Sequence, residues 1–314
     1  MTTVMGPGDL KKAQDAAGYD PLKDPAAPVV FQTLDEMKPH ESVTLLLYGG
    51  SATGKTWFVA TAGPRTLIIN IGDGLATIQS QVVKKKFYQD GMPIVATIHE
   101  ERDPTTGMFL TATALDQVMR AIDWAMDKFP DRFDTIAVDD ATQLRSFAMN
   151  KGLELNQDFD RSKTLEKARK EKNFGAFVPA IQDYGAEMDL IELFIAETMT
   201  LCKKEKKHFI LTAHERHTYK PMKDMSGKKI GEELDKIRPG FTGKTFPDDI
   251  TNYFDLVWRM EALQTGQGPV HRAQTADSKG IKAKSRYPGV FSALETYPNF
   301  LSIVERIKKS HVAA

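Results

Sequence analysis

The chain has 314 residues, which is enough to bury a large core in one domain or slightly more. Its 42 Lys and Arg residues balance 42 Asp and Glu residues, so the protein is not uniformly basic, although a local basic groove stays possible. The single cysteine, Cys202, excludes an intramolecular disulfide. Met1–Pro28 has no apolar signal segment, and no apolar run approaches the roughly 20 residues of a membrane span. We therefore expect a cytoplasmic protein without membrane contact.

Residues 1–38 form the first segment along the chain. They are rich in Pro, Gly, Asp and Lys, with one short apolar patch at Val29-Val30-Phe31. Such a composition buries too little apolar surface to hold a fixed structure by itself. We predict a flexible N-terminal arm ahead of a domain that begins near residue 39.

A glycine-rich segment follows the first predicted strand, Val43–Tyr48. It fits the pattern G-x-x-x-x-G-K-[ST], and an apolar segment able to form a helix comes directly after it. Glycines let backbone N–H groups converge on phosphate oxygens, and the helix start adds its unpaired N–H groups. In this pattern Lys55 reaches the β- and γ-phosphates and the Thr56 hydroxyl binds Mg²⁺. The sequence therefore predicts that ATP and Mg²⁺ bind here, with these residues around the nucleotide: Gly49, Gly50, Ser51, Ala52, Thr53, Gly54, Lys55, Thr56 and Trp57.

Strands and helices alternate through the middle of the chain. Residues 66–71 form an apolar run without polar alternation, as expected of a parallel strand that is buried on both faces. Apolar residues at helical spacing, such as those at 113–129, predict amphipathic helices. By the same patterns we predict further strands over 94–98, 133–138 and 208–213, and further helices over 75–86, 144–155 and 184–201.

Residues 218–249 are polar and rich in lysine, and we predict a long functional loop there. The loop contains a second Gly-Lys-Thr at Gly243–Thr245. Arg238 stands where the phosphate-binding pattern needs its first glycine, and Pro247 lies where its helix would have to begin. We therefore predict no second phosphate site of this kind.

The last part of the chain predicts a strand pair and a helix. Residues 256–262 and 270–274 are joined by a turn with two glycines, which is typical of an antiparallel pair. The tail, 291–314, contains a predicted helix over 300–309. With the alternating elements before it, this indicates an α/β protein that has a mostly parallel sheet, helices on both faces and a C-terminal antiparallel strand pair.

Asp139 and Asp140 come directly after the predicted strand 133–138. A carboxylate after an apolar strand is typical of the acid that orients waters on Mg²⁺ in P-loop proteins, so we predict that Asp139 joins Thr56 in the metal site. The alternative is an Asp that caps the next helix. For Asp140 both roles stay open, because it either polarises the attacking water or caps the helix.

Asp73 and His214 also follow predicted strands, and ligands of parallel sheets bind at the carboxyl ends of strands. Asp73 is a second candidate for activating water, but an Asp between two glycines is also common in turns. His214 lies where a polar side chain can sense the γ-phosphate, or it is simply a hydrogen-bonded histidine. We keep Lys55, Asp140, Asp73 and His214 as candidate catalytic residues.

Two basic segments are candidates for contact with nucleic acid, one within 218–249 and the other at 161–172. Nearby aromatic residues such as Tyr219 can stack on bases. The alternative is that both segments are solvated surfaces, as charge runs usually are. The positions that we predict to contact DNA are Lys220, Lys223, Lys228, Lys229, Arg161 and Lys170.

With these motifs in place, the chain from about Val43 to Arg286 resembles the RecA-like P-loop ATPases that phage genomes encode as nucleotide-binding and single-strand annealing or recombination proteins. The resemblance depends on GGSATGKT, TIAVDD and FILTAHE, on Asp183-Tyr184-Gly185 at the entry to a long helix, and on Lys282, Lys284 and Arg286. It implies a RecA-like ATPase domain over residues 39–290, between the N-terminal arm and the C-terminal tail.

The resemblance also implies a homo-oligomer, either a ring or a filament, with ATP between subunits and single-stranded DNA on loops that follow the strands. Lys284 and Arg286 would reach the ATP of the neighbouring subunit as charge-stabilising fingers. The alternative for both is surface charge beside a Pro-Gly turn. A single-strand-binding protein is a further implied partner, and the location would be the host-cell cytoplasm if a phage encodes the chain.

Three positions depart from the family pattern. The acid that the family has near Asn70–Gly72 comes one place later here, as Asp73. Asp140 stands where the family often has Ser, and Ser285 stands where it often has Asp. These departures leave open which carboxylate activates water.

Three functions compete on these observations. The first, which we predict, is a DNA-stimulated ATPase that acts on single strands in recombination, annealing or replication. The second is a switch, such as a helicase loader, that uses ATP to assemble. The third, a small-molecule kinase, would need lid arginines near the P-loop, but the region from Pro93 to Thr113 contains only Arg102.

Overall fold

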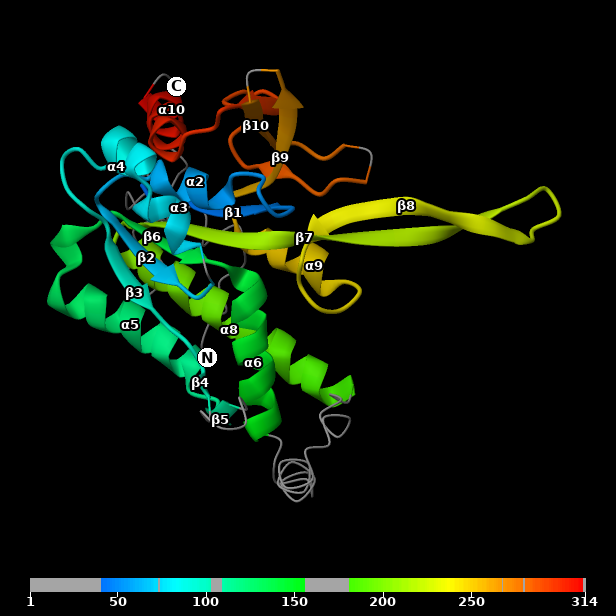
Figure 1. Cartoon of the computed structure of the whole chain (residues 1–314), viewed down its shortest axis with the longest axis horizontal. Helices are drawn as coiled ribbons and strands as arrows, with labels where there is room; N and C mark the ends of the chain where they lie inside the picture. The colour runs from blue at the N-terminus through cyan, green and yellow to red at the C-terminus, as the bar shows by residue number, and fades with distance from the viewer. Residues whose placement is uncertain are drawn as a thin grey trace, which may run out of the picture. The chain divides into compact units, whose positions relative to one another are not determined.

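The computed structural model describes residues 41–72, 74–102, 109–155, 181–266, 268–278 and 280–312. They belong to one compact unit that begins at Glu41. Among these residues, ten strands form the main sheet, and its central path runs in the order β12-β10-β9-β1-β7-β6-β2-β3 (Figure 1). The flexible N-terminal segment predicted at 1–38 lies outside the described residues.

Six neighbouring strands of the main sheet are parallel. Their order places β7 and β9 on either side of β1, the strand that leads into the P-loop. The parallel strands are β9 (Leu256–Thr265), β1 (Thr44–Gly49), β7 (His208–Lys223), β6 (Thr135–Asp139), β2 (Thr66–Asn70) and β3 (Ile94–Thr97).

The remaining strands are antiparallel. β10 (Gly268–Gln274) pairs with β9 and with β12 (Leu294–Thr296), and β11 (Lys284–Ser285) pairs with the start of β9. β8 (Lys229–Pro239) pairs with the outer half of β7. A separate small hairpin consists of β4 (Glu101–Arg102) and β5 (Phe109–Thr111).

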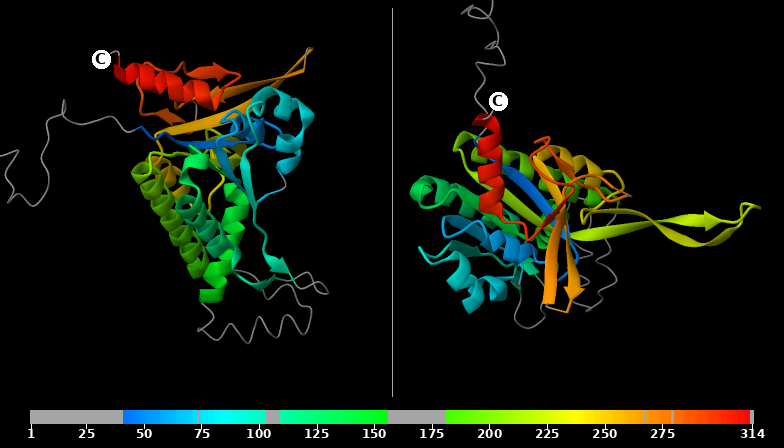
Figure 2. Two further views of the ribbon diagram at one scale, coloured as in Figure 1. Left: turned by 90° about the vertical axis from the view of Figure 1, so that its left-hand side faces the viewer. Right: turned by 90° about the horizontal axis from the view of Figure 1, so that it is seen from above.

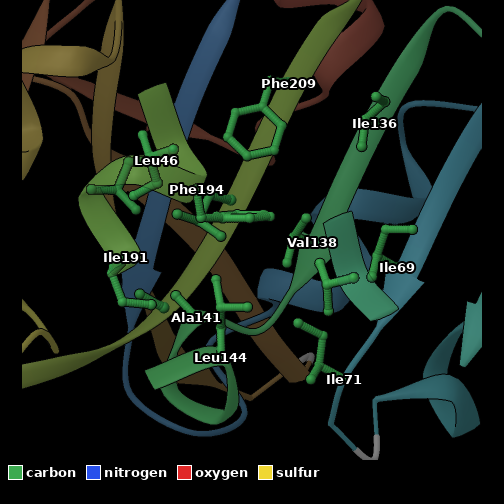
Figure 3. Close-up of a cluster of buried hydrophobic side chains, with 14 of the residues drawn as sticks. Leu46, Ile69, Ile71, Ile136, Val138, Ala141, Leu144, Ile191, Phe194 and Phe209 are labelled. Atoms are coloured by element: carbon green, nitrogen blue, oxygen red, sulfur yellow. The ribbon is translucent and has the colours of Figure 1, made fainter. Parts of the chain in front are cut away.

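Helices cover both faces of the sheet because its central strands are apolar on both sides. Along β1, Leu46 and Tyr48 belong to one buried cluster, whereas Leu45 and Leu47 belong to another. Figure 3 shows part of the first cluster, in which residues of β2, β6 and β7 meet those of two helices. The helices of that face are α5 (Ala114–Lys128), α6 (Ala141–Leu155) and α8 (Ile181–Lys204).

The opposite face carries the helix after the P-loop and the C-terminal helix. In Figure 2, α10 lies across the sheet from α6 and α8. Phe300 of α10 packs edge-on against Phe58 of α2, with ring centroids 6.2 Å apart, and its backbone N–H donates to Thr61 Oγ1. The helices of this face are α2 (Lys55–Ala60), α3 (Leu75–Gln79), α4 (Gln81–Phe87) and α10 (Phe300–Val312).

The predicted architecture is confirmed: an α/β core with a mostly parallel sheet, helices on both faces and C-terminal antiparallel strands. The single helix predicted at 75–86 is wrong in one respect. Ser80 takes an extended backbone conformation and splits the segment into α3 and α4, where its hydroxyl caps α4 by accepting from Val83 N. Among the described residues, no helix is long and apolar enough to span a membrane.

The predicted loop at 218–249 is wrong. β7 continues past the sheet to Lys223 and pairs with β8, and together they form a two-stranded hairpin that projects from the core (Figure 1). We call residues 215–239 the arm. Two short elements follow the arm, the helix α9 (Phe246–Asp249) and the 3-10 turn η6 (Ile250–Tyr253). A further 3-10 turn, η3 (Pro130–Arg132), follows α5. Charged side chains on both faces of the arm hide the two-residue alternation that identifies a half-buried strand.

Candidate active site

The P-loop is a tight turn between β1 and α2, and two of its glycines are required by their surroundings. A Cβ at Gly49 would lie 2.4 Å from the Met260 carbonyl oxygen of β9, so no side chain fits there. Gly54 has φ of +95°, and a Cβ there would lie 2.7 Å from His271 Nδ1. His271 in turn contacts the Thr53 carbonyl at 2.9 Å, so β10 supports the loop from outside. The sequence analysis did not identify His271.

Lys55 begins α2 and bends back over the loop. Its Nζ donates to the carbonyl oxygens of Gly49, at 3.0 Å, and Gly50, at 2.8 Å. Burial lowers the pKa of Lys55, while the carboxylates of Asp139, Asp140 and, more weakly, Glu215 counter that effect. The ammonium group thus lies against the P-loop backbone, where a triphosphate would replace the two carbonyls as its partner.

Thr56 and Asp139 meet at the carboxyl edge of the sheet. The Thr56 hydroxyl donates to Asp139 Oδ2 at 2.8 Å, and the Thr212 hydroxyl of β7 donates to Asp139 Oδ1 at 2.5 Å. Burial raises the pKa of Asp139, and these two hydrogen bonds oppose it. The two oxygens that were predicted to serve the metal thus lie side by side.

The surroundings of Thr56 and Asp139 fit Mg²⁺. A Cβ at Gly74 would lie 2.8 Å from Asp139 Oδ2 and 3.2 Å from Thr56 Oγ1, so the glycine leaves space beside both oxygens. Within the described residues, no group of three or more His, Cys, Asp or Glu could bind a metal. A site with one hydroxyl and one carboxylate suits an ion that takes most ligands from phosphates and water. Asp73, the alternative acid beside Gly74, lies outside the described residues.

Asp140 is engaged on both carboxylate oxygens. Oδ1 accepts from Gln143 N and so caps α6, and Oδ2 lies 3.2 Å from His214 Nε2. His214 faces Gly49 in the register of β1 and β7. Both candidates therefore lie beside the P-loop, and Asp140 performs the capping role that the sequence left open.

Glu215, the next residue of β7, is a site residue that the sequence analysis missed. Its Oε2 accepts from Arg259 Nε of β9 at 2.9 Å, and its Oε1 lies 2.9 Å from His217 Nε2. A Cβ at Gly50 would lie 3.7 Å from Oε1, so the carboxylate is adjacent to the P-loop. Burial would raise the pKa of Glu215, but the hydrogen bonds from Arg259 and His217 outweigh it and lower the pKa. The pair places one negative and one positive charge beside the phosphate site.

Opposite effects on ATP affinity are expected for the two members of this pair. Glu215→Gln removes a negative charge next to the loop and should tighten ATP binding about fivefold, whereas Arg259→Gln leaves that charge unpaired and should weaken binding by a similar factor. The measurement is titration with a fluorescent ATP analogue, with thermal melting to check folding. If both variants shift affinity in the same direction, the electrostatic role of the pair is wrong.

A small cavity adjoins Gly54 on the side of α2. Trp57, predicted to bind the nucleotide, lies in its wall, and the Lys86 ammonium lies 5.4 Å from the centroid of the Trp57 ring. Aromatic rings with a few hydrogen-bonding groups are the chemistry that a nucleoside requires. The other residues of the wall include Phe87, Met260, His271, Tyr297 and Asn299.

Lys284 and Arg286 lie away from their own P-loop. Lys284 pairs with Val257 near the start of β9, whereas the P-loop glycine Gly49 faces Met260 farther along the same strand. Arg286 is half-exposed and held by Asp255 Oδ1, at 3.1 Å, and by the Asn252 carbonyl, at 2.6 Å. Among the residues that the structure describes, no hydrogen bond or ion pair joins either side chain to the P-loop of its own chain.

The candidate DNA contacts fall in two places. Lys220, Lys223, Lys228 and Lys229 lie on the arm, where Lys220 pairs with Glu233 at 3.2 Å and Lys229 pairs with Glu232 at 2.7 Å. Such exposed pairs are weak and can open for a phosphate. Arg161 and Lys170 lie outside the described residues.

A comparison with known protein families assigns most of the chain to one family. The family described as an AAA domain matches residues 41–287, more than three quarters of the chain. No curated protein sequence matches. A similar solved structure is that of a KaiC-like protein from the hyperthermophilic archaeon Pyrococcus horikoshii, with 11% identity, 83% of this chain and 91% of that chain covered, and a TM-score of 0.38. The matched residues include the P-loop, Thr56 and Asp139, and the chain therefore belongs to the AAA domain family and has the fold of a P-loop ATPase.

Proposed function

We propose that the protein hydrolyses ATP and acts on single-stranded DNA, in the recombination, annealing or replication of a phage. The observation that carries the proposal is the continuity of β7. Its inner half ends at His214 and Glu215 beside the P-loop, and its outer half forms the lysine-bearing arm. A change at the γ-phosphate therefore has a direct structural route to the surface that would hold the DNA.

The residues of the P-loop supply the chemistry of hydrolysis. Lys55 and the N-terminus of α2 would stabilise the charge that develops on the transferred phosphoryl group. Thr56 and Asp139 would hold Mg²⁺, which neutralises the phosphate oxygens when it is bound. Asp73, Asp140 and His214 are the candidates for orienting the attacking water.

We further propose a homo-oligomer, a ring or a filament, in which ATP binds between subunits. Lys284 and Arg286 lie near the amino-terminal end of β9, whereas phosphates bind at the carboxyl ends of the strands. A charge-stabilising role for these residues therefore requires the ATP of a neighbouring subunit. In this proposal the protein works in the host-cell cytoplasm, and a single-strand-binding protein is a further partner.

Hydrolysis of ATP should rise severalfold with single-stranded DNA and respond less to duplex DNA. The measurement is phosphate release at increasing DNA concentration. Lys284→Ala should remove most of the stimulated rate, while Lys309→Ala, an exposed lysine of α10, serves as the matched control.

Two results would contradict the DNA function or favour the alternative of an assembly switch. If the rate of ATP hydrolysis does not change with DNA, and no salt-sensitive complex with DNA forms, the DNA function is wrong. If ATP then changes the size of the assembly on gel filtration, and Lys55→Ala prevents the change, the alternative of an ATP-dependent assembly switch is favoured.

A further inference from the structure

Two hollows lie at the base of the arm, and Arg238 lines both. The first is lined by Lys236, Arg238, Asp248, Asp277, Ser278 and Lys282. The second is lined by Arg216, Thr218, Arg238, Gly243, Lys244 and Pro247. The two hollows share Arg238, so they adjoin each other near the end of β8.

The side chains around the hollows are mostly positive. Five cations, Arg216, Lys236, Arg238, Lys244 and Lys282, face two acids, Asp248 and Asp277, which leaves three positive charges in excess. Lys236 and Lys282 are only loosely paired, because the ammonium of each lies 3.8 Å from a carboxylate oxygen. This excess is unusual for a chain whose formal charge is zero.

Arg238 gives the hollows a fixed centre. Its side chain is only 9% exposed and donates to Asp248 Oδ2 at 2.8 Å and to the Lys244 carbonyl at 3.0 Å. The floor of the first hollow is equally fixed, because a Cβ at Gly280 would lie 2.4 Å from the Asp235 carbonyl and Ile237 N donates to the Gly280 carbonyl. Arg238 is thus positioned before any ligand arrives.

We propose that these hollows bind the phosphodiester backbone of a nucleic acid strand that crosses the base of the arm. The ligand is a polyanion because two neighbouring anion sites share one arginine. It is held by its backbone because no described residue that lines either hollow is aromatic, so bases have nothing there to stack on. This inference rests on the proposed DNA function and gives it a second contact surface, separate from the lysines of the outer arm.

The test is fluorescence anisotropy with a labelled oligothymidylate of about 30 nucleotides and with a duplex of the same length, over a range of salt concentrations. The double variant Lys236→Gln/Lys282→Gln should bind the single strand about tenfold more weakly, with the salt slope reduced by about 1.4 for two lost contacts. The control Lys203→Gln/Lys204→Gln, at the exposed end of α8, makes the same charge change and should bind as the wild type does.

A variant that is expected to bind DNA more tightly distinguishes a lost contact from a loss of folding. Asp277 is an exposed acid in the first hollow, and its Oδ1 accepts from Ala283 N. Asp277→Asn keeps an oxygen for that hydrogen bond and removes the charge that opposes the phosphate. It should bind the oligothymidylate severalfold more tightly, which a destabilised protein would not do.

The outcomes separate this inference from the function on which it rests. If the wild type binds the strand and neither Lys236→Gln/Lys282→Gln nor Asp277→Asn changes the affinity, the hollows are not the site and the DNA function stands. If the wild type binds neither probe, both proposals are wrong. If the duplex alone shows the expected changes, the proposed single-stranded ligand is wrong and the strand crosses the arm as part of a helix.

Discussion

Lys55→Ala should lower the rate of ATP hydrolysis by at least about a hundredfold, because it removes the one cation that the P-loop holds against the phosphates. In the structure Lys55 Nζ has two carbonyl oxygens as partners, within 3.0 Å, and is surrounded by Asp139, Asp140 and Glu215. Without Lys55, the negative charges of a bound triphosphate would be repelled by these three carboxylates. The measurement is phosphate release with Mg²⁺ and ATP, beside binding of a fluorescent ATP analogue.

Lys203→Ala is the matched control, since Lys203 is an exposed lysine at the end of α8. It should hydrolyse ATP at the wild-type rate. The two variants should also melt at similar temperatures, because the ammonium of Lys55 serves the loop and not the core. Retention of normal hydrolysis by Lys55→Ala would mean that the P-loop is not the site of catalysis.

The nucleotide site could be predicted from the sequence because its parts are local. Gly49 to Thr56 is one uninterrupted turn, and the chemistry of phosphate binding restricts its residues strongly. The position of Asp139 could also be predicted from the sequence, since a carboxylate at the end of an apolar strand must lie at the carboxyl edge of a parallel sheet. The hydrogen bond between Thr56 and Asp139 confirms that both lie at that edge.

The supporting residues could not be predicted, because they come from distant parts of the chain. Glu215 and Arg259 meet only when β7 and β9 flank β1, and His271 reaches Thr53 across more than two hundred residues. No local pattern specifies that strand order. The position of Glu215 directly after His214 was the one signal available.

The arm was missed for a different reason. Its strands carry Lys and Glu residues that pair across and along the hairpin, as Lys220 does with Glu233. These pairs replace the apolar face by which a strand is usually recognised. A polar hairpin outside the core therefore has the composition of a loop.

His208 is expected to make the protein sensitive to acid. It begins β7, is buried, and its Nδ1 accepts from Val43 N at 3.0 Å, while its ring lies edge-on to Phe300. Burial, and then the positive charge of Lys308, lowers the pKa of His208 from 6.5 to about 4, although Asp134 opposes the shift. A proton on Nδ1 would also abolish the hydrogen bond from Val43.

Acid destabilises the folded protein because the pKa of His208 is lower in the folded state than in the unfolded chain. The unfolded chain takes up a proton at His208 below pH 6.5, but the folded protein does so only near pH 4, so acid favours unfolding between those values. The loss of stability from this residue is about 2 kcal/mol by pH 5 and about 3 kcal/mol by pH 4. Asp139 acts in the opposite direction, because burial raises its pKa.

His208→Asn isolates the effect, since the Asn oxygen can accept from Val43 N and does not titrate. The variant should be less stable than the wild type at pH 7.5, because it loses the packing of the ring on Phe300. The difference should shrink by about 2 kcal/mol at pH 5, because only the wild type has to bury a group that binds protons there. Urea unfolding at each pH measures it, and contributions from Asp139 cancel because both proteins contain them. Parallel pH profiles would show that the folded and the unfolded chain protonate His208 at the same pH, so that the ring reaches water in the folded protein.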